Sequence, residues 1–255
     1  MNVIEEYLQV SAGALFVQRW RPEQVTGAPI VLLHDSLGCV ALWRDFPQAL
    51  AQRCGREVIA YDRLGFGRSS VQHEPSPLSF IDDQARQVLP ELVQGLALDD
   101  YVLCGHSVGG AMALAAASLS QRCVGVISIS AQAFVEDKTL AGIEQAKCAF
   151  AEPEQFARLE KWHGPRARWV LEAWTQVWLA PEFRAWSLTP YLAQVHCPVL
   201  VIHGQADEYG SCAFPEHIAA QVVGPVQSLI LPGCGHVPHR EQAPVVLQAI
   251  AGFLS

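Results

Sequence analysis

Short apolar runs alternate along the chain with longer stretches of helical character. Continuous runs of aliphatic residues predict strands that are buried on both faces, as in a parallel sheet. We expect such strands at 30–34, 57–61, 101–105, 124–130, 198–204 and 226–232, and helices at 42–53, 80–95 and 107–121. This alternation predicts an α/β fold with a mostly parallel sheet and helices on both faces.

The beginning of the chain has another pattern. Residues 3–9 and 14–19 have strand character, and Ser11-Ala12-Gly13 between them predicts a turn. We therefore expect an antiparallel hairpin ahead of the parallel strands.

Between Ser130 and Pro198 no segment has strand character. This stretch contains five of the seven tryptophans, namely Trp162, Trp169, Trp174, Trp178 and Trp186. Trp174 and Trp178 are spaced to share one face of a helix. We expect residues 134–190 to form a helical insertion in a core made of 1–133 and 191–255, and its side chains to form part of an apolar pocket: Trp162, Trp174 and Trp178. Alternatively, each tryptophan only packs the insertion against the core.

Composition narrows the class of protein. A length of 255 residues suits one core with an insertion, and a net charge of −8 argues against a nucleic-acid-binding surface. The eight cysteines are dispersed without a Cys-x-x-Cys pair, so we expect reduced thiols and no metal site. No glycine-rich phosphate or dinucleotide loop follows a strand, and we expect no cofactor.

The chain contains no apolar run long enough to span a membrane, and its first residues have no signal-peptide pattern. We expect a cytoplasmic protein whose partner is a small-molecule substrate. Nucleic acid and membrane are not expected as partners, and a homodimer is left open.

One motif indicates a chemistry. The stretch Gly105-His106-Ser107-Val108-Gly109 lies between a predicted strand and an Ala-rich predicted helix, and it fits the pattern Gly-x-Ser-x-Gly. A sharp turn of this kind exposes the serine hydroxyl at a helix N-terminus, which favours negative charge. Ser107 is therefore the candidate nucleophile, although a Gly/Ser turn without a function has the same pattern.

A serine nucleophile needs a base, and the base needs an acid that orients it. Two late strands supply candidates in the order that follows a nucleophile elbow, because Asp207 follows the strand 198–204 and His236 follows the strand 226–232. Glu208 is an alternative acid, and His239 is an alternative base. The main candidates all fall at the carboxyl ends of strands, where parallel sheets bind ligands.

Together with two earlier motifs, these residues resemble the α/β-hydrolase fold superfamily, in the branch that carries a helical cap. The earlier motifs are Leu33-His34-Asp35-Ser36-Leu37-Gly38 and Tyr61-Asp62-Arg63-Leu64-Gly65-Phe66-Gly67-Arg68-Ser69. The motifs occur in the order of the family and span nearly the whole chain. The resemblance implies the α/β-hydrolase fold with an eight-stranded sheet, and it makes the insertion 134–190 a cap.

By position, the resemblance assigns the backbone N–H groups of an oxyanion hole to Ser36 and Val108. Asp35 stands where many relatives have glycine, and we expect its side chain to face away from the site. His34 is a further candidate for the substrate pocket. The other polar residues of these motifs are expected to be structural: Asp62, Arg63 and His106. In the insertion, Arg166 or Arg168 either binds a substrate carboxylate or lies on a solvated helix face.

These assignments predict a serine hydrolase. Ser107 attacks a carbonyl carbon, His236 takes its proton, Asp207 stabilises the imidazolium, and water releases the acyl-enzyme. We expect the substrate to be a small to medium, mainly apolar carboxylic ester or lactone. Two alternatives are open: hydrolysis of a carbon–carbon bond in a diketone from aromatic-ring cleavage, and a non-catalytic ligand receptor on the same fold.

Overall fold

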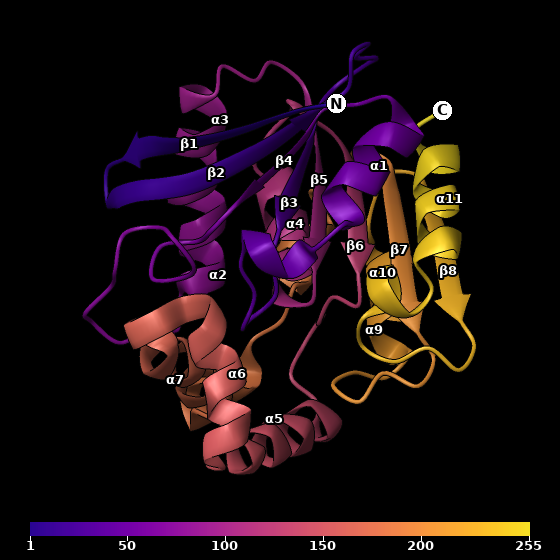
Figure 1. Cartoon of the computed structure of the whole chain (residues 1–255). Coiled ribbons are helices and arrows are strands. Elements are labelled where there is room, and N and C mark those ends of the chain that lie inside the picture. The colour runs from indigo at the N-terminus through magenta and orange to yellow at the C-terminus, as the bar shows by residue number, and fades with distance from the viewer.

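The computed structural model describes all 255 residues, and its central feature is a sheet of eight strands. The strands are β1 (Asn2–Val10), β2 (Gly13–Arg21), β3 (Ile30–Leu33), β4 (Val58–Tyr61), β5 (Tyr101–His106), β6 (Cys123–Ile129), β7 (Val199–Gly204) and β8 (Val226–Leu231). Their order across the sheet is β1-β2-β4-β3-β5-β6-β7-β8 (Figure 1). β1 and β2 form the expected antiparallel hairpin, β2 runs antiparallel to β4, and β3 to β8 are parallel. The expected fold class is thus confirmed.

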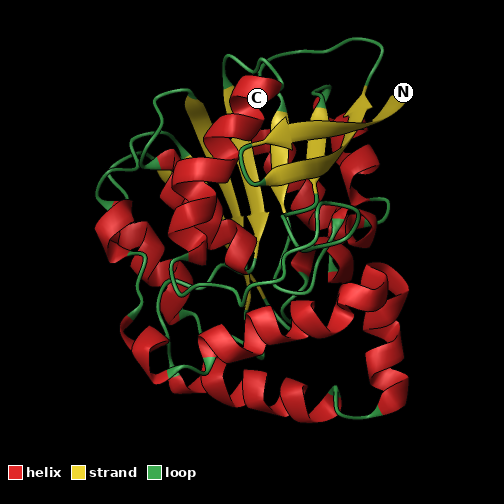
Figure 2. Cartoon of the chain, turned by 90° about the vertical axis from the view of Figure 1, so that its left-hand side faces the viewer, coloured by secondary structure: helices red, strands yellow, loops and turns green.

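Helices cover both faces of the sheet (Figure 2). α1 (Phe46–Cys54) and α11 (Ala243–Phe253) pack on one face, in the same apolar cluster as Ile30 and Leu32. The other face carries α2 (Phe80–Asp83), the π-helical turn η2 (Gln84–Val88), α3 (Leu89–Gly95), α4 (Val108–Ala117) and α9 (Ala213–Gln221), with Val31 and Leu33. Because successive residues of a strand point to opposite faces, the short strand β3 contributes to both layers.

Each predicted strand is present within two residues of its expected ends, whereas two predicted helices are interrupted. The helix expected at 42–53 is divided into η1 (Val40–Trp43) and α1, because Arg44 between them has a left-handed backbone with φ of 53°. The helix expected at 80–95 contains η2 just ahead of Pro90 in α3. A proline ring and its missing N–H disrupt regular helical hydrogen bonding, and the wider turn accommodates them.

Residues 134–190, which we call the helical segment, connect β6 to the rest of the core. They contain α5 (Asp137–Ala149), α6 (Pro153–His163), η3 (Gly164–Arg166), α7 (Ala167–Trp178) and η4 (Pro181–Ala185), and α8 (Thr189–Leu192) begins at their end. These helices form a layer below the sheet, beyond the carboxyl ends of its parallel strands (Figure 1). Phe134 and Ser187 form an isolated β-bridge, and Leu188 donates its N–H to the Ala133 carbonyl at 2.8 Å. The helical segment therefore leaves and rejoins the core at one place.

Among the contacts that hold the helical segment against the core, two involve the loops after β3 and β4. Phe66, from the loop after β4, packs with apolar residues of α6 and α7. His163 at the end of α6 is buried, and it accepts the Gly67 N–H at Nδ1 (3.1 Å) and donates from Nε2 to the Leu37 carbonyl (3.0 Å). These contacts fix the helices over two loops at the strand ends. None of the helices combines the length and the apolar character needed to cross a bilayer.

Candidate active site

Ser107 lies in a sharp turn between β5 and α4. Its backbone has φ of 56° and ψ of −126°, which is rare for a residue with a side chain. Two glycines permit this turn, because a Cβ on Gly105 would lie 2.0 Å from the Gly109 carbonyl oxygen, and a Cβ on Gly109 would lie 2.1 Å from that of Leu33. The turn places Ser107 at the N-terminus of α4, where the helix dipole favours negative charge.

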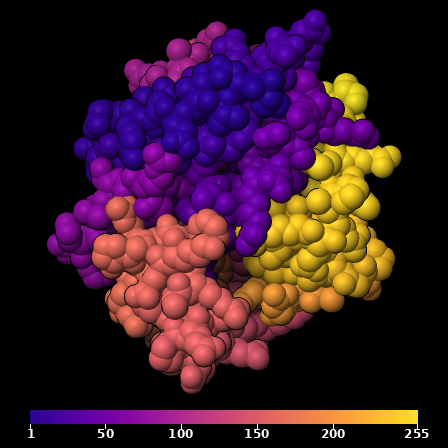
Figure 3. Space-filling view, in the orientation of Figure 1, coloured from indigo at the N-terminus to yellow at the C-terminus, as the bar shows by residue number.

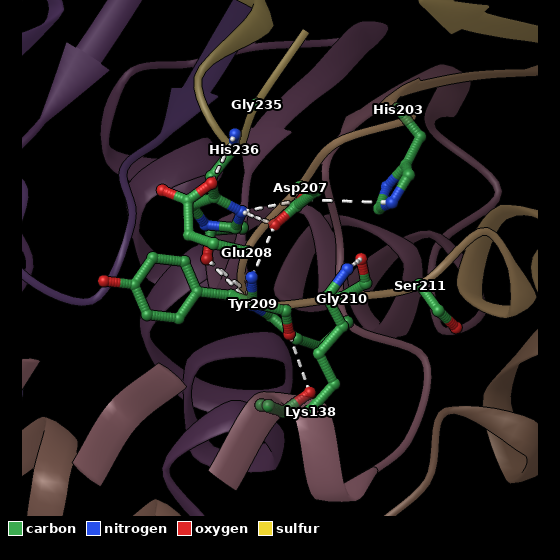
Figure 4. A network of polar contacts seen from close by, with 12 residues as sticks. Lys138, His203, Asp207, Glu208, Tyr209, Gly210, Ser211, Gly235 and His236 are labelled. Atoms are coloured by element: carbon green, nitrogen blue, oxygen red, sulfur yellow. Dashed lines mark hydrogen bonds and ion pairs between the residues drawn. The ribbon is translucent and has the colours of Figure 1, made fainter. Parts of the chain in front are cut away.

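His236 and Asp207 approach each other from the loops after β8 and β7 (Figure 4). Nδ1 of His236 lies 2.9 and 2.8 Å from the two carboxylate oxygens of Asp207. Nδ1 therefore carries a hydrogen, and Nε2 is left as the basic nitrogen. Burial alone would raise the pKa of Asp207, but the hydrogen bond and the charge of His236 outweigh it and lower that pKa. The carboxylate thus stays ionised and orients the imidazole.

The loop that carries His236 is held by other polar groups. Glu208 accepts the backbone N–H of His236 at 3.2 Å, and Glu241 accepts two further N–H groups of this loop at 2.7 and 3.0 Å. The carbonyl oxygen of His236 accepts a hydrogen bond from Nε2 of His106 at 2.8 Å. Glu208, the alternative acid, therefore contacts the backbone of the loop and not the imidazole.

His239, the alternative base, has a packing position. Its ring centre is 4.9 Å from that of Trp43 and 4.6 Å from that of His106, and the side chain is buried. Burial lowers the pKa of His239 well below its usual range, so the ring is neutral. No group of three or more His, Cys, Asp or Glu side chains is arranged to hold a metal ion.

Two backbone donors beside Ser107 are free. Neither the N–H of Ser36 nor that of Val108 donates a hydrogen bond within the protein. Ser36 belongs to the loop after β3, and it forms part of the same cavity wall as Ser107. Free N–H groups directed at the place where charge develops are the requirement for an oxyanion hole.

The Asp35 side chain does not face away from the site, contrary to our expectation from the sequence. It forms part of the wall of the cavity that contains Ser107, and 31% of it is exposed. Its Oδ1 accepts the Leu37 N–H at 2.9 Å, and its Oδ2 lies 3.3 Å from Nδ1 of His106. Burial would raise the pKa of Asp35, but the hydrogen bond and charge of His106 lower it. The carboxylate closes the turn of its own loop, and this fixes its direction.

Ser107 and His236 face one cavity of about 140 Å³. The hollow lies between the helical segment, coloured salmon, and the yellow C-terminal part of the chain (Figure 3). The Ser107 hydroxyl accepts a hydrogen bond from Nε2 of Gln132 at 3.1 Å, donates to Oε1 of the same side chain at 3.4 Å, and is not hydrogen-bonded to His236. The hydroxyl must therefore turn from Gln132 to His236 before the imidazole can take its proton.

Of the side chains proposed for the pocket, Trp174 and Trp178 border the cavity, whereas His34 does not. His34 is 1% exposed, and both of its ring nitrogens are used. Nε2 accepts the Arg63 N–H at 3.1 Å, and Nδ1 donates to the Asp35 carbonyl at 2.8 Å. His34 therefore supports the loop after β3 from behind and has no contact with the cavity.

Trp162, which we also expected in the pocket, lies away from it. The residues that α6 buries are Leu159 and His163, which are spaced to share one face. Trp162 precedes His163 by one residue and therefore points in another direction, where the Lys161 ammonium lies 5.1 Å from its ring centre. The contact of α6 with the core, not the indole itself, decides which face is turned inward.

Two residues that border the cavity, Gln132 and Tyr209, were not among those predicted from the sequence to lie there. Both follow strands at their carboxyl ends, so the strand-end rule would have found them. The Tyr209 ring centre is 4.9 Å from that of His236. Trp169 borders a second groove of about 290 Å³, where its ring would be 2.3 Å from a Cβ on Gly65.

Most of the chain matches a known family. Residues 30–249 match the model of the Alpha/beta hydrolase family. The proline iminopeptidase of Lactobacillus delbrueckii subsp. lactis is 31% identical over 114 residues, which are 45% of this chain and only 38% of that relative's length.

Solved structures share the fold over nearly the full length. A membrane phospholipase A, described as a bacterial virulence factor, has a TM-score of 0.81 and 20% identity, with coverage of 99% of this chain and 86% of that one. The enol-lactonase from Burkholderia xenovorans LB400 has a TM-score of 0.76 and 19% identity, with coverage of 98% and 99%. At these identities the similarity establishes the fold alone.

Proposed function

Because the chain belongs to the alpha/beta hydrolase family, we propose that it is a serine hydrolase that cleaves a carboxylic ester or lactone through an acyl-enzyme. The observation that carries the proposal is the meeting of Ser107 and the His236–Asp207 pair at one cavity beside two free backbone donors. In this proposal the core comprises 1–133 and 191–255, and the helical segment 134–190 is a cap over the cavity.

The proposed acylation begins at the Ser107 hydroxyl. Its oxygen attacks the carbonyl carbon while Nε2 of His236 takes the proton, and Asp207 stabilises the resulting imidazolium. The N–H groups of Ser36 and Val108 bind the negative oxygen of the tetrahedral intermediate. When the intermediate collapses, the imidazolium returns the proton to the leaving alkoxide, and the acyl group stays on Ser107.

Deacylation repeats these steps with water. His236 takes a proton from the water as its oxygen attacks the acyl carbon, and the second tetrahedral intermediate expels the Ser107 oxygen. The imidazolium then protonates that oxygen, which restores the resting hydroxyl and releases the acid. For a lactone, the leaving alkoxide and the acid are parts of one product.

The walls of the cavity favour a small to medium, mainly apolar substrate. Trp174, Trp178 and Ile143 of the helical segment face Ser107 across a space of about 140 Å³. Aromatic and aliphatic walls are typical of small-molecule sites, and the polar residues of this wall, such as Gln132 and His236, lie among the residues around Ser107. The volume favours short acyl chains next to the reacting carbon.

The test is hydrolysis of p-nitrophenyl esters from acetate to octanoate by wild type and by Ser107→Ala. We expect turnover in wild type that is lost in the variant, with the chain-length optimum among the short esters. Turnover that survives in Ser107→Ala would contradict the assignment of the nucleophile.

Two further substrates test the bond type. Proline p-nitroanilide represents the activity named for the Lactobacillus relative, and a vinylogous diketone represents carbon–carbon bond hydrolysis. Ser107-dependent turnover of only one of these two would replace the ester assignment with that reaction. Tight binding of an ester without turnover would support the receptor alternative.

A further inference from the structure

The groove next to the Ser107 cavity contains a buried arginine. This groove of about 290 Å³ shares Ser36, Trp174 and Trp178 with the cavity, so the two spaces are parts of one site. Arg63, in the loop after β4, forms part of the groove wall although it is only 5% exposed. Because Ser36 borders both spaces, a molecule held at Ser107 can extend past it into the groove that Arg63 borders.

The Arg63 guanidinium has only one acceptor in the protein. Nη2 donates to the Asp35 carbonyl at 2.8 Å, and Nε is buried with no partner. Nη2 also lies 3.5 Å from Nδ1 of His34. That nitrogen carries a hydrogen, since the other nitrogen of the His34 ring accepts a backbone N–H, and it cannot accept a second one.

The Arg63 guanidinium also forms no direct ion pair, although, against the larger effect of burial, the charge of the nearby Asp35 carboxylate acts to raise its pKa. The Phe66 ring lies against the guanidinium, with its centre 4.2 Å away. Burial lowers the pKa of Arg63 to about 10, so the guanidinium is still a cation at neutral pH. A buried cation without a partner is unfavourable, and a bound anion would offset this cost.

The other charged groups around the groove do not neutralise Arg63. Glu74 at the groove is exposed, and Asp83 accepts a hydrogen bond from the Ser79 hydroxyl at 2.8 Å. Asp35 directs its carboxylate to His106 and the Leu37 N–H, as described above.

The sequence also indicated Arg166 or Arg168 of the helical segment as a possible carboxylate ligand. Both side chains have other contacts. Arg166 donates to the carbonyl oxygens of Phe66 and Ser69. Arg168 is exposed, and its guanidinium lies 4.2 Å from the ring centre of Phe156. Neither borders the groove or the cavity.

We propose that Arg63 binds a carboxylate of the substrate, so that the preferred substrates are esters or lactones that carry a free carboxylate remote from the bond cleaved at Ser107. This inference rests on the proposed function and specifies its substrate class. A guanidinium with unused N–H donors in a fixed plane matches the two oxygens of a carboxylate. The apolar walls between Ser107 and Arg63 suit the carbon chain that joins the two groups.

The test measures binding in Ser107→Ala, where no hydrolysis by Ser107 interferes. Isothermal titration calorimetry compares monomethyl adipate, which has one free carboxylate, with dimethyl adipate, which has none. We expect the monoester to bind at least about tenfold more tightly, as is typical of a charge-assisted hydrogen bond. If the monoester binds equally well or more weakly than the diester, the inference is overturned. This comparison needs no variant of Arg63.

Variants then assign the preference to one side chain. Ser107→Ala with Arg63→Met should lose the preference, and Ser107→Ala with Arg63→Lys should retain part of it, because a lysine keeps the charge but not the planar donors. The matched control Ser107→Ala with Arg168→Met removes the same charge from α7 and should retain the whole preference. A preference that survives Arg63→Met in a variant with an unchanged Tm overturns the role of Arg63.

Turnover separates this inference from the proposed function. If monomethyl adipate binds selectively but no ester is hydrolysed by wild type, the proposed function fails and the Arg63 site stands. If wild type hydrolyses neutral esters through Ser107 and shows no preference for the monoester, the Arg63 site fails and the proposed function stands.

Discussion

The loops at the strand ends and the helical segment face the same cavity, but they position their side chains in different ways. In the loops, the backbone fixes each proposed reacting group: a turn with positive φ presents Ser107, and Glu208 holds the backbone of His236. In the helical segment, Trp174 and Trp178 face the cavity because their helix packs over the core. The reacting groups are thus set by local backbone structure, and the shape of the pocket is set by tertiary packing.

This difference predicts two kinds of variant. A change in the loops should reduce turnover and leave the free energy of unfolding nearly unchanged. A change in the helical segment should alter stability or substrate preference and leave the chemical step largely intact.

The largest expected effect is that of Ser107→Ala. Loss of the proposed nucleophile should lower kcat for p-nitrophenyl acetate by roughly 10⁴ to 10⁶-fold. The turn around this residue is held by backbone contacts, so the Tm should stay within a few degrees of wild type. Steady-state kinetics and thermal unfolding on the same preparations check both parts, and a large fall in Tm would break the comparison.

Asp207→Asn should have the next largest effect, a fall in kcat of about 10⁴-fold, because the amide no longer selects the productive tautomer of His236. It also has a signature in stability. The pKa of Asp207 is lowered from its ordinary value of 3.8, so the folded state binds fewer protons than the unfolded state in the window below that value. Its stabilisation is complete above pH 3.8 and is lost as the pH falls through the lower folded-state pKa.

The measurement is urea unfolding of wild type and Asp207→Asn between pH 3 and pH 7. Wild type should have a higher free energy of unfolding than Asp207→Asn. This difference should be constant at the upper end of the pH range and should shrink as the pH falls below 3.8. A difference that does not change with pH would mean that Asp207 is not ionised in the fold.

Trp178→Ala addresses the helical segment. This side chain is 2% exposed, and its ring centre lies 5.2 Å from that of Phe183 and 5.6 Å from that of Trp186. Its removal leaves a cavity and should lower the free energy of unfolding by about 3 to 5 kcal/mol. Chemical denaturation measures the loss, while kcat for p-nitrophenyl acetate should keep its order of magnitude. Loss of turnover without loss of stability would contradict the proposed difference between the loops, which position the reacting groups, and the helical segment, which shapes the pocket.

Trp174→Ala should have the smallest effect. This side chain is only partly buried, and it faces both the cavity and the groove. Loss of apolar contact with a longer acyl chain should raise KM for p-nitrophenyl octanoate by about tenfold. The KM for the acetate, which does not reach the indole, should be nearly unchanged, and an equal rise for both esters would place Trp174 outside the chain-length pocket.

The same difference explains what could be predicted from the sequence. The strands followed from continuous apolar runs, and Asp207 and His236 were brought into contact because each directly follows a strand whose end is fixed by the sheet. Gln132 was within reach of the same rule, since it follows β6.

Side-chain direction could not be predicted where tertiary contacts decide it. Asp35 turns toward the cavity because it accepts an N–H of its own loop and meets His106 from another strand. Trp162 points elsewhere because the buried face of α6 carries Leu159 and His163. A pattern within α6 alone does not indicate which face meets the core.

The bridge between Phe134 and Ser187 bears on how such a molecule can change its substrate over evolutionary time. Because the chain departs and returns at one junction, the residues between are an excursion whose length does not affect strand order. Closing a longer excursion is inexpensive, since each doubling of a loop adds only about 0.6 kcal/mol of closure entropy. Insertions or deletions within this excursion therefore leave the order of the strands unchanged. We therefore expect related proteins to keep the loops at the strand ends and to differ in selectivity through the residues between Phe134 and Ser187.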